Sequence, residues 1–359
     1  VVLSSQKGRF LRYGQRAYLP QILGLGLGRT LGLSYVATVF LGKFFNLLFC
    51  TAVVTCAIRF SKYGKRTLMC VGLLPTTVFL FSSFTYDAFV IALLMLGIAL
   101  FVTEYLSEEK IQTKRTMVSI LAMVVGCFSK AVYIPFLALY WLMPKDKFYS
   151  RRQKNLFKAI LMFASFILPL IGNVTSGAEV GDYRGGDTSQ TSQLSMILGY
   201  PLTYTGVLLK SLGTTFASYF IGSKVLANFA YRGIYDGIGY FVVLLAMLFT
   251  FVTDFGMTEK TYDAQMKRKI LMMKIWNAVL IFGTACLVWT ALYLDFTPVG
   301  SMVINGVSPR YYLPLIFPLS LIFINQKVRC SMKLENYQSL IAFLMLIGTG
   351  ISIYCLMLA

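Results

Sequence analysis

The stretch Tyr35-Val-Ala-Thr-Val-Phe-Leu-Gly-Lys-Phe-Phe-Asn-Leu-Leu-Phe-Cys-Thr-Ala-Val-Val-Thr-Cys-Ala-Ile58 decides the class of fold. Its one charged residue is Lys43, whose long stem can carry the ammonium group to a polar layer. A helix crosses the hydrocarbon core of a bilayer with about 20 mostly apolar residues. The stretch is therefore predicted to span a membrane, and it ends at a basic cluster, Arg59, Lys62, Lys65 and Arg66.

The composition extends this prediction to the whole chain. Hydrophobic residues make up 57% of its 359 residues, only 13% are charged, and the mean hydropathy is +0.70. Apolar content of this kind is typical of membrane bundles and exceeds what a soluble domain needs. The net charge of +19 would suggest nucleic-acid binding in a soluble protein, but the basic residues fall between apolar runs. We therefore expect an all-α polytopic integral membrane protein, with a lipid bilayer and no nucleic acid as its partner.

Further apolar runs divide the chain into one membrane domain with roughly nine to eleven membrane segments, some of them re-entrant. Residues 1–34 are predicted to form a basic extracytoplasmic segment and an interfacial helix, and 35–175 a helical bundle. Residues 176–235 are expected to be an extracytoplasmic loop with surface helices, and 236–359 the C-terminal helices. The expected spans are 35–58, 67–84, 88–106, 156–171, 238–252, 271–294, 311–324 and 340–358.

Residues 117–144 form an apolar run with basic loops at both ends. One straight span would place one of these loops on the wrong side of the membrane. We therefore predict two half-helices, 117–128 and 132–143, that meet at Ser129-Lys130. With this hinge, the basic loops at 59–66, 107–116, 145–155, 255–270 and 325–335 all face the cytoplasm, and 176–235 and 295–309 face outward.

Arg310 lies in Gly306-Val-Ser-Pro-Arg310-Tyr311-Tyr312-Leu-Pro314, where a polar loop enters an apolar run. The loop from 295 to 309 contains no Lys or Arg, so this cation is isolated on the outward face. The planar guanidinium fork suits bidentate contact with a lipid-linked phosphate. The alternative is an interfacial anchor beside Tyr311 and Tyr312.

Two further ionisable residues are candidates for the same site. Lys130 lies deep in an apolar segment, with Tyr133 shortly after it, and an intramembrane lysine is a functional hypothesis by default. Its alternatives are an ion pair within the bundle and extension to the interface. Asp87 occupies the tight turn Ser82-Ser-Phe-Thr-Tyr86-Asp87. It is a candidate general base or head-group ligand, or else the N-cap of the helix expected from residue 88.

Cofactor chemistry has little support in the composition. The chain has no histidine, and its seven cysteines show no paired spacing. We expect no disulfide, no zinc and no organic cofactor, while a divalent cation stays open.

Several stretches in order along the chain resemble one family. They include Tyr18-Leu-Pro20, Leu-Gly-Arg29-Thr, Ser129-Lys130-Ala-Val-Tyr133 and Val307-Ser-Pro-Arg310-Tyr311. Together they resemble the bacterial predicted-membrane-protein family catalogued as domain of unknown function 2142, whose members resemble C-type membrane glycosyltransferases. The family commonly has Gly-Arg-Tyr where this chain has Pro309-Arg310-Tyr311.

The resemblance implies transfer of a sugar from a polyprenyl-phosphate carrier to a cell-surface glycan, on the extracytoplasmic face of a bacterial cell membrane. It implies phosphate-binding roles for Arg310, Lys130 and Arg29, with Tyr311 and Tyr133 beside them. C-type enzymes carry a catalytic acid in their first extracytoplasmic loop, and no acidic residue precedes Asp87. We therefore expect the main catalytic carboxylate to lie before residue 1, with Asp87 as the candidate within the chain. The alternatives are a transporter or flippase of lipid-linked sugars and a non-catalytic scaffold of polysaccharide assembly.

Overall fold

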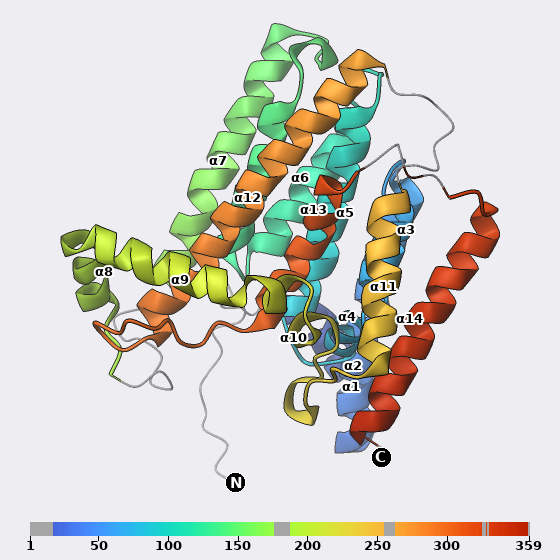
Figure 1. The fold of residues 1–359 in the computed structure, drawn as a ribbon, viewed down its shortest axis with the longest axis vertical. Helices are drawn as coiled ribbons and strands as arrows, with labels where there is room; N and C mark the ends of the chain where they lie inside the picture. Colours follow the sequence, from blue (N-terminus) through green and yellow to red (C-terminus); the bar gives the residue numbers. More distant parts are fainter. Residues whose placement is uncertain (1–16, 176–186, 255–262, 325–327, 329, 358–359) are drawn as a thin grey trace.

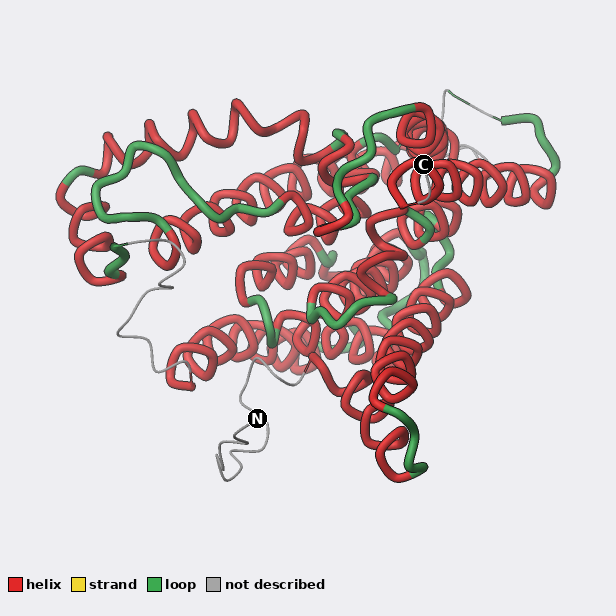
Figure 2. The backbone as a smooth tube through the Cα atoms, turned by 90° about the horizontal axis from the view of Figure 1, so that it is seen from below, coloured by secondary structure: helices red, strands yellow, loops and turns green. Residues whose placement is uncertain are grey.

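The computed structural model describes residues 17–175, 187–254, 263–324, 328 and 330–357. Helices and loops account for these residues apart from one isolated β-bridge, Asn228–Ile234 (Figures 1 and 2). The elements in chain order are α1 (Leu19–Thr30), α2 (Tyr35–Phe60), α3 (Lys65–Gly72), α4 (Pro75–Phe81), α5 (Asp87–Leu106), α6 (Thr113–Cys127), η2 (Ala131–Leu142), η3 (Lys145–Lys147), α7 (Arg151–Thr175), α8 (Gln190–Gly199), α9 (Pro201–Phe220), α10 (Ser223–Leu226), η5 (Ala230–Arg232), α11 (Ile238–Thr253), α12 (Ala264–Phe296), η7 (Pro309–Tyr312), α13 (Leu313–Ile322) and α14 (Leu334–Met357).

Four of these helices, α2, α5, α12 and α14, are long and apolar enough to cross a membrane. Almost every residue of α5 is buried, so this helix forms the centre of the bundle. The other three leave many apolar side chains exposed, which suits contact with lipid. The structure thereby confirms an all-α polytopic membrane protein.

The expected span at 67–84 is divided into two short helices. Two short helices, α3 and α4, occupy this stretch, and Leu73 and Leu74 separate them. Pro75 is the first residue of α4, and a proline disfavours helical geometry in the residue before it. The break therefore follows from Pro75, whose effect on the backbone a prediction based on hydrophobicity alone does not include.

Helices α1 and α2 form a close hairpin because small residues line its seam. A Cβ atom on Gly24 would lie 2.6 Å from the Leu41 carbonyl oxygen, and one on Gly28 would lie 3.0 Å from the side chain of Thr38. Small residues four apart let the backbones of membrane helices approach in this way. The expected interfacial helix is thus α1, seated on the first half of α2.

This hairpin holds the turn before α5. Asn46 of α2 donates its side-chain amide to the carbonyls of Phe81 (2.9 Å) and Ser83 (3.1 Å). Gln21 of α1 donates to the carbonyl of Thr85 (3.2 Å). Phe81 is the last residue of α4, and Ser83 and Thr85 lie in the turn before α5, so the amides supply hydrogen-bond donors to carbonyls at the end of one helix and in the turn to the next. The position of Asp87, two residues further on, is set by this arrangement.

The run at 117–144 is divided at the expected place. Helix α6 ends at Cys127, η2 begins at Ala131, and Lys130 lies in the connection. The second limb is a 3₁₀ helix with Pro135 inside it, whereas we expected an α-helical half. On α6, Ser119 donates to the carbonyl of Gly97 in α5, so α6 packs closely along the central helix.

Polar contacts join neighbouring loops to the C-terminal end of α5, which is the end away from Asp87. The buried ammonium of Lys147 donates to the carbonyls of Glu104, Ser107 and Glu109 where α5 ends. A cation is favourable at the C-terminus of a helix. The amide of Lys62 donates to Thr103 of the same helix, which brings the loop after α2 to this end. The basic loops at 59–66, 107–116 and 144–148 therefore lie together.

We expect cysteine labelling from outside the cell to distinguish the two ends. In a cysteine-less background, a membrane-impermeant maleimide should label Val303→Cys, which is exposed in the loop after α12, but not Tyr149→Cys, which is equally exposed before α7. Permeabilised cells should label both. Labelling of Tyr149→Cys in intact cells would overturn the assignment of the basic loops to the cytoplasm.

Candidate functional site

Asp87 is the first residue of the central helix α5, and its side chain does not cap that helix. The N-cap position belongs to Tyr86, and no side chain caps the end. The Asp87 amide donates to Thr85 Oγ1 (3.2 Å), and this hydroxyl in turn contacts Oδ2 of Asp87 (3.4 Å). The carboxylate is therefore turned away from the backbone of α5 and toward other helices, although a negative charge there still suits the helix dipole.

Lys130 and Arg310 converge on this carboxylate from two distant parts of the chain. Lys130 Nζ lies 2.5 Å from Oδ1 of Asp87, and Arg310 Nε lies 3.1 Å from Oδ2. The side chains of Asp87 and Lys130 are 4% and 12% exposed, whereas that of Arg310 is 40% exposed. Two buried members thus anchor the cluster, and the guanidinium forms its accessible edge.

Tyrosine rings surround the two cations. The ammonium of Lys130 lies 3.5 Å from the ring centre of Tyr311 and 5.1 Å from that of Tyr86. The hydroxyl of Tyr133 donates to the backbone carbonyl of Tyr311 (2.6 Å), which ties η2 to η7. An aromatic face attracts a cation without neutralising its charge. The rings therefore hold Lys130 in place and leave its positive charge available.

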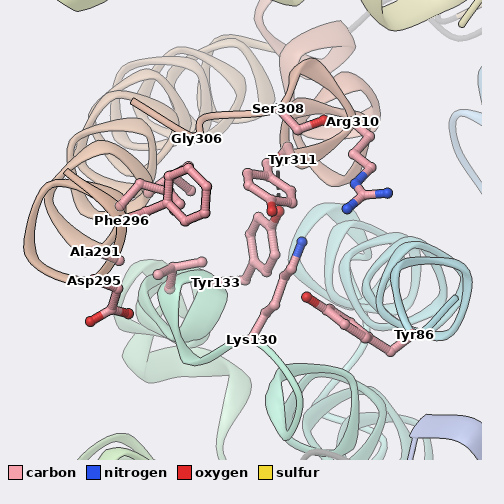
Figure 3. A pocket seen from close by; sticks show the side chains of 13 residues that line it. Tyr86, Lys130, Tyr133, Ala291, Asp295, Phe296, Gly306, Ser308, Arg310 and Tyr311 are labelled. Carbon is pink, nitrogen blue, oxygen red and sulfur yellow. Dashed lines mark hydrogen bonds between the residues drawn. The ribbon is translucent and has the colours of Figure 1, made fainter. Parts of the chain in front are cut away.

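The cluster opens onto a cavity of about 430 Å³ between α5, η2, α12 and η7 (Figure 3). This volume is within the range of small-molecule sites. Its wall includes Lys130, Arg310, Tyr86, Tyr133, Tyr311, Ser308 and, on the α12 side, Asp295 and Phe296. Polar and apolar side chains both line it, as expected for a site that fixes the orientation of a polar ligand.

Positive charge is concentrated on one side of this cavity. Lys130 and Arg310 both pair with the single carboxylate of Asp87, and neither forms an ion pair with another acidic residue of the described segments, while the carboxylate of Asp295 lies on the α12 side. Tyr18 lies beside Tyr86, and burial, reinforced by the Asp87 carboxylate, raises the pKa of its phenol, so that it stays neutral. An anion is the ligand that this concentration of positive charge favours.

The structure does not bring every predicted residue to this cavity. Arg29 lies in the last turn of α1, exposed, at the end of that helix opposite Gln21 and the Asp87 turn. Conversely, Tyr18 and Asp295 belong to the surroundings of the site, and their positions in the sequence do not single them out. Tyr86 also belongs there, and its position directly before Asp87 is a partial signal in the sequence.

A second, apolar cavity of about 380 Å³ lies between α9, α12 and α13. Ile281 and Ala285 of α12 line it, and Val288 and Leu292 line the polar cavity further along the same helix. These four positions follow the spacing of a single helix face. One face of α12 therefore lines both cavities, and the charged cavity is the one nearer the C-terminus of the helix.

Gly306 of the loop before η7 offers a direct test of the cavity's shape. Its φ of +79° is left-handed, and a Cβ atom there would lie 2.3 Å from the ring of Phe296. We expect Gly306→Ala to displace Phe296 and to weaken ligand binding at least tenfold. Gly300→Ala, also left-handed but with a Cβ atom only in ordinary contact with Met196 at 3.9 Å, should change stability only. Equal binding by the wild type and Gly306→Ala would show that this wall does not contact the ligand.

The described residues contain no group of three His, Cys, Asp or Glu side chains placed to hold a metal ion. Among the described residues, the positively charged side chains at the cavity are the ammonium of Lys130 and the guanidinium of Arg310.

Fold and site together define a polytopic membrane protein with a charged cavity at the meeting point of broken helices. Residues 4–319 match the family model described as "Predicted membrane protein (DUF2142)", and the chain belongs to this family. No curated protein and no solved structure matches the chain.

Proposed function

We propose that this protein transfers a sugar from a polyprenyl-phosphate carrier to a glycan on the extracytoplasmic face of a bacterial cell membrane. The observation that supports this most directly is the pair Lys130 and Arg310, which presents positive charge to a tyrosine-lined cavity. The adjoining apolar cavity on the same face of α12 offers a place for the isoprenoid chain. A carrier that joins a phosphate to a long apolar chain matches both.

In this proposal the two cations act on the leaving group. As the bond between the sugar and the phosphate breaks, negative charge grows on the phosphate oxygens, and Lys130 and Arg310 are placed to stabilise it. The guanidinium of Arg310 is the more exposed of the two and makes the first contact with the carrier. Lys130, held between Asp87 and Tyr311, supplies charge from deeper in the site.

Asp87 serves in this scheme to hold the cations. Its oxygen Oδ1 contacts Lys130, Oδ2 contacts Arg310 and Thr85, and only 4% of the side chain is exposed. Neither oxygen is therefore placed to meet an acceptor hydroxyl. A buried carboxylate between two cations prevents their mutual repulsion and fixes the spacing at which they meet the phosphate.

The test uses purified full-length protein, polyprenyl-phosphate sugars of several kinds and a range of oligosaccharide acceptors. Sugar transfer and binding of polyprenyl phosphate are both expected. A transporter would bind the carrier and move it across a proteoliposome membrane without transfer. A scaffold would do neither, so either result would contradict the proposed activity.

A further inference from the structure

A third cavity, of about 460 Å³, lies between α6 and α7 and shares no lining residue with the two cavities described above. It is lined by residues within 113–124 of α6 and within 153–163 of α7. Both helices pack against η2. The amide of Ile111 donates to the carbonyl of Lys147 (2.9 Å), which joins the loops that precede the two helices. The cavity is therefore a groove, the α6–α7 groove, with the N-termini of both helices at one end.

The α6–α7 groove is apolar and open along its side. Met117 and Leu121 of α6 and Leu156 of α7 line it, and these side chains are 64%, 62% and 64% exposed. From Thr113 to Val124 the chain advances 11 residues, or about 16 Å at the rise of an α-helix. The hydrocarbon core of a bilayer is about 30 Å thick, so the groove is about as deep as one leaflet. Its length suits an acyl chain.

The end of the groove at which the helices begin is basic. Lys114 precedes Met117 by three residues and Arg152 precedes Leu156 by four, so each cation shares a helix face with a residue of the groove. Both cations are exposed, and neither forms an ion pair with another residue that the structure describes. They are free to meet an anion at the mouth of the groove.

Further cations lie close together at this end. Partial desolvation and the neighbouring charges of Lys158, Lys145 and Arg151 lower the pKa of Lys154, which directly follows Gln153 of the groove. An anionic group placed among these side chains would relieve their mutual repulsion. Basic pockets beside membrane helices recognise lipid head groups in this way.

The first turn of α6 adds hydrogen-bond donors. No side chain caps this end of the helix, and amides at a helix N-terminus bind phosphate readily. One turn further, Thr116 lines the groove, is 3% exposed, and has a hydroxyl without a hydrogen-bond partner among the described residues. By contrast, α7 is capped, because Ser150 accepts the amide of Gln153 (3.1 Å). The start of α6 is therefore the better place for a phosphate.

We propose that the α6–α7 groove binds an anionic phospholipid, of the phosphatidylglycerol class, from the leaflet beside the basic loops. The phosphate lies at the first turn of α6 between Lys114 and Arg152, the hydroxyl of Thr116 donates to an ester carbonyl one turn deeper, and an acyl chain fills the groove. These loops are predicted to face the cytoplasm, which assigns the lipid to that leaflet. The site is separate from the charged cavity, so the inference does not depend on sugar transfer.

The probe is phosphatidylglycerol with a photoactivatable group in one acyl chain, added to the full-length protein in phosphatidylcholine nanodiscs. Cross-links are expected within 113–124 and 153–163, and unlabelled phosphatidylglycerol should compete with them. Soluble glycerophosphoglycerol, which has the head group without the chains, should not compete. The double variant Lys114→Glu, Arg152→Glu should lower the labelling at least about tenfold, because the reversed charges repel the phosphate. Leu121→Trp, which fills the groove, should abolish it.

The matched control reverses two exposed cations at the start of α12 that do not line the groove. Labelling of Lys267→Glu, Arg268→Glu should stay within about twofold of the wild type, since the effect of a surface charge falls off with distance. Equal competition by added phosphatidylcholine would overturn the choice of an anionic lipid. Cross-links outside these two segments, or full labelling of Leu121→Trp, would overturn the site. Disulfide-linked dimers of Leu121→Cys that persist when phosphatidylglycerol is added would assign the groove to a second copy of the chain.

Discussion

Arg310→Ala is expected to lower sugar transfer by about 10²–10³-fold, the range seen when one group that stabilises developing charge is removed. Arg310→Lys should retain an intermediate activity, because lysine keeps the charge but not the planar fork that contacts phosphate at two points. Binding of polyprenyl phosphate should weaken in the same order. The measurement is the transfer rate and carrier affinity of the three proteins in the same lipid nanodiscs.

The opposite result would identify Arg310 as an anchor at the membrane interface. Lysine would then replace it almost fully, since both side chains can extend to the polar layer. As a control, Arg29→Ala removes a cation of helix α1 that lies away from the cavity, and its carrier affinity should match that of the wild type. Equal activity of the Arg, Lys and Ala proteins would refute the phosphate role of Arg310.

Lys130→Met is expected to abolish transfer and also to destabilise the fold. The substitution keeps the length of the side chain, but it leaves the buried Asp87 carboxylate with Arg310 as its one ion-pair partner among the described residues. Removing one member of a buried pair costs up to about 3–5 kcal/mol. Thermal unfolding in nanodiscs and the transfer rate measure the two effects separately.

The double variant Lys130→Met, Asp87→Asn distinguishes stability from activity. Neutralising Asp87 removes the uncompensated negative charge, so much of the lost stability should return, while Arg310 is exposed enough to be hydrated. Transfer should stay abolished, because the phosphate site lacks one cation and the carboxylate that positions the other. Full transfer by either variant would confine Lys130 to a structural role.

Charge placement made part of this site predictable from the sequence. Lys130 stood out because an ammonium group inside an apolar run is expensive, and Arg310 because its loop has no other basic residue. Both reach one carboxylate, and the hinge that delivers Lys130 follows from the basic loops on either side of it.

The remaining features depend on contacts between distant segments. From the sequence alone, Asp87 can equally be the N-cap of a helix. Its contacts with Lys130 and Arg310 depend on how distant helices pack together. The family resemblance groups Arg29 with Arg310, yet α1 places Arg29 away from the cavity. Asp295 lies in the last turn of a long helix, α12, and the cavity it lines exists only once α12 and η2 have packed together.

The hold of the α1–α2 hairpin on the Asp87 turn has a consequence for biosynthesis. In a chain inserted from its N-terminus, helices α1 and α2, with the side-chain amides of Gln21 and Asn46 that bind the turn, form before the turn itself emerges from the ribosome. Asp87 is then inserted 43 residues ahead of Lys130, its ion-pair partner. Arg310 is synthesised after most of the bundle. In a nascent chain that ends before Arg310, the charges of Lys130 and Asp87 would cancel, and this pair would not attract phosphate. The site acquires both of its cations, and with them any affinity for an anionic carrier, only after Arg310 has been synthesised.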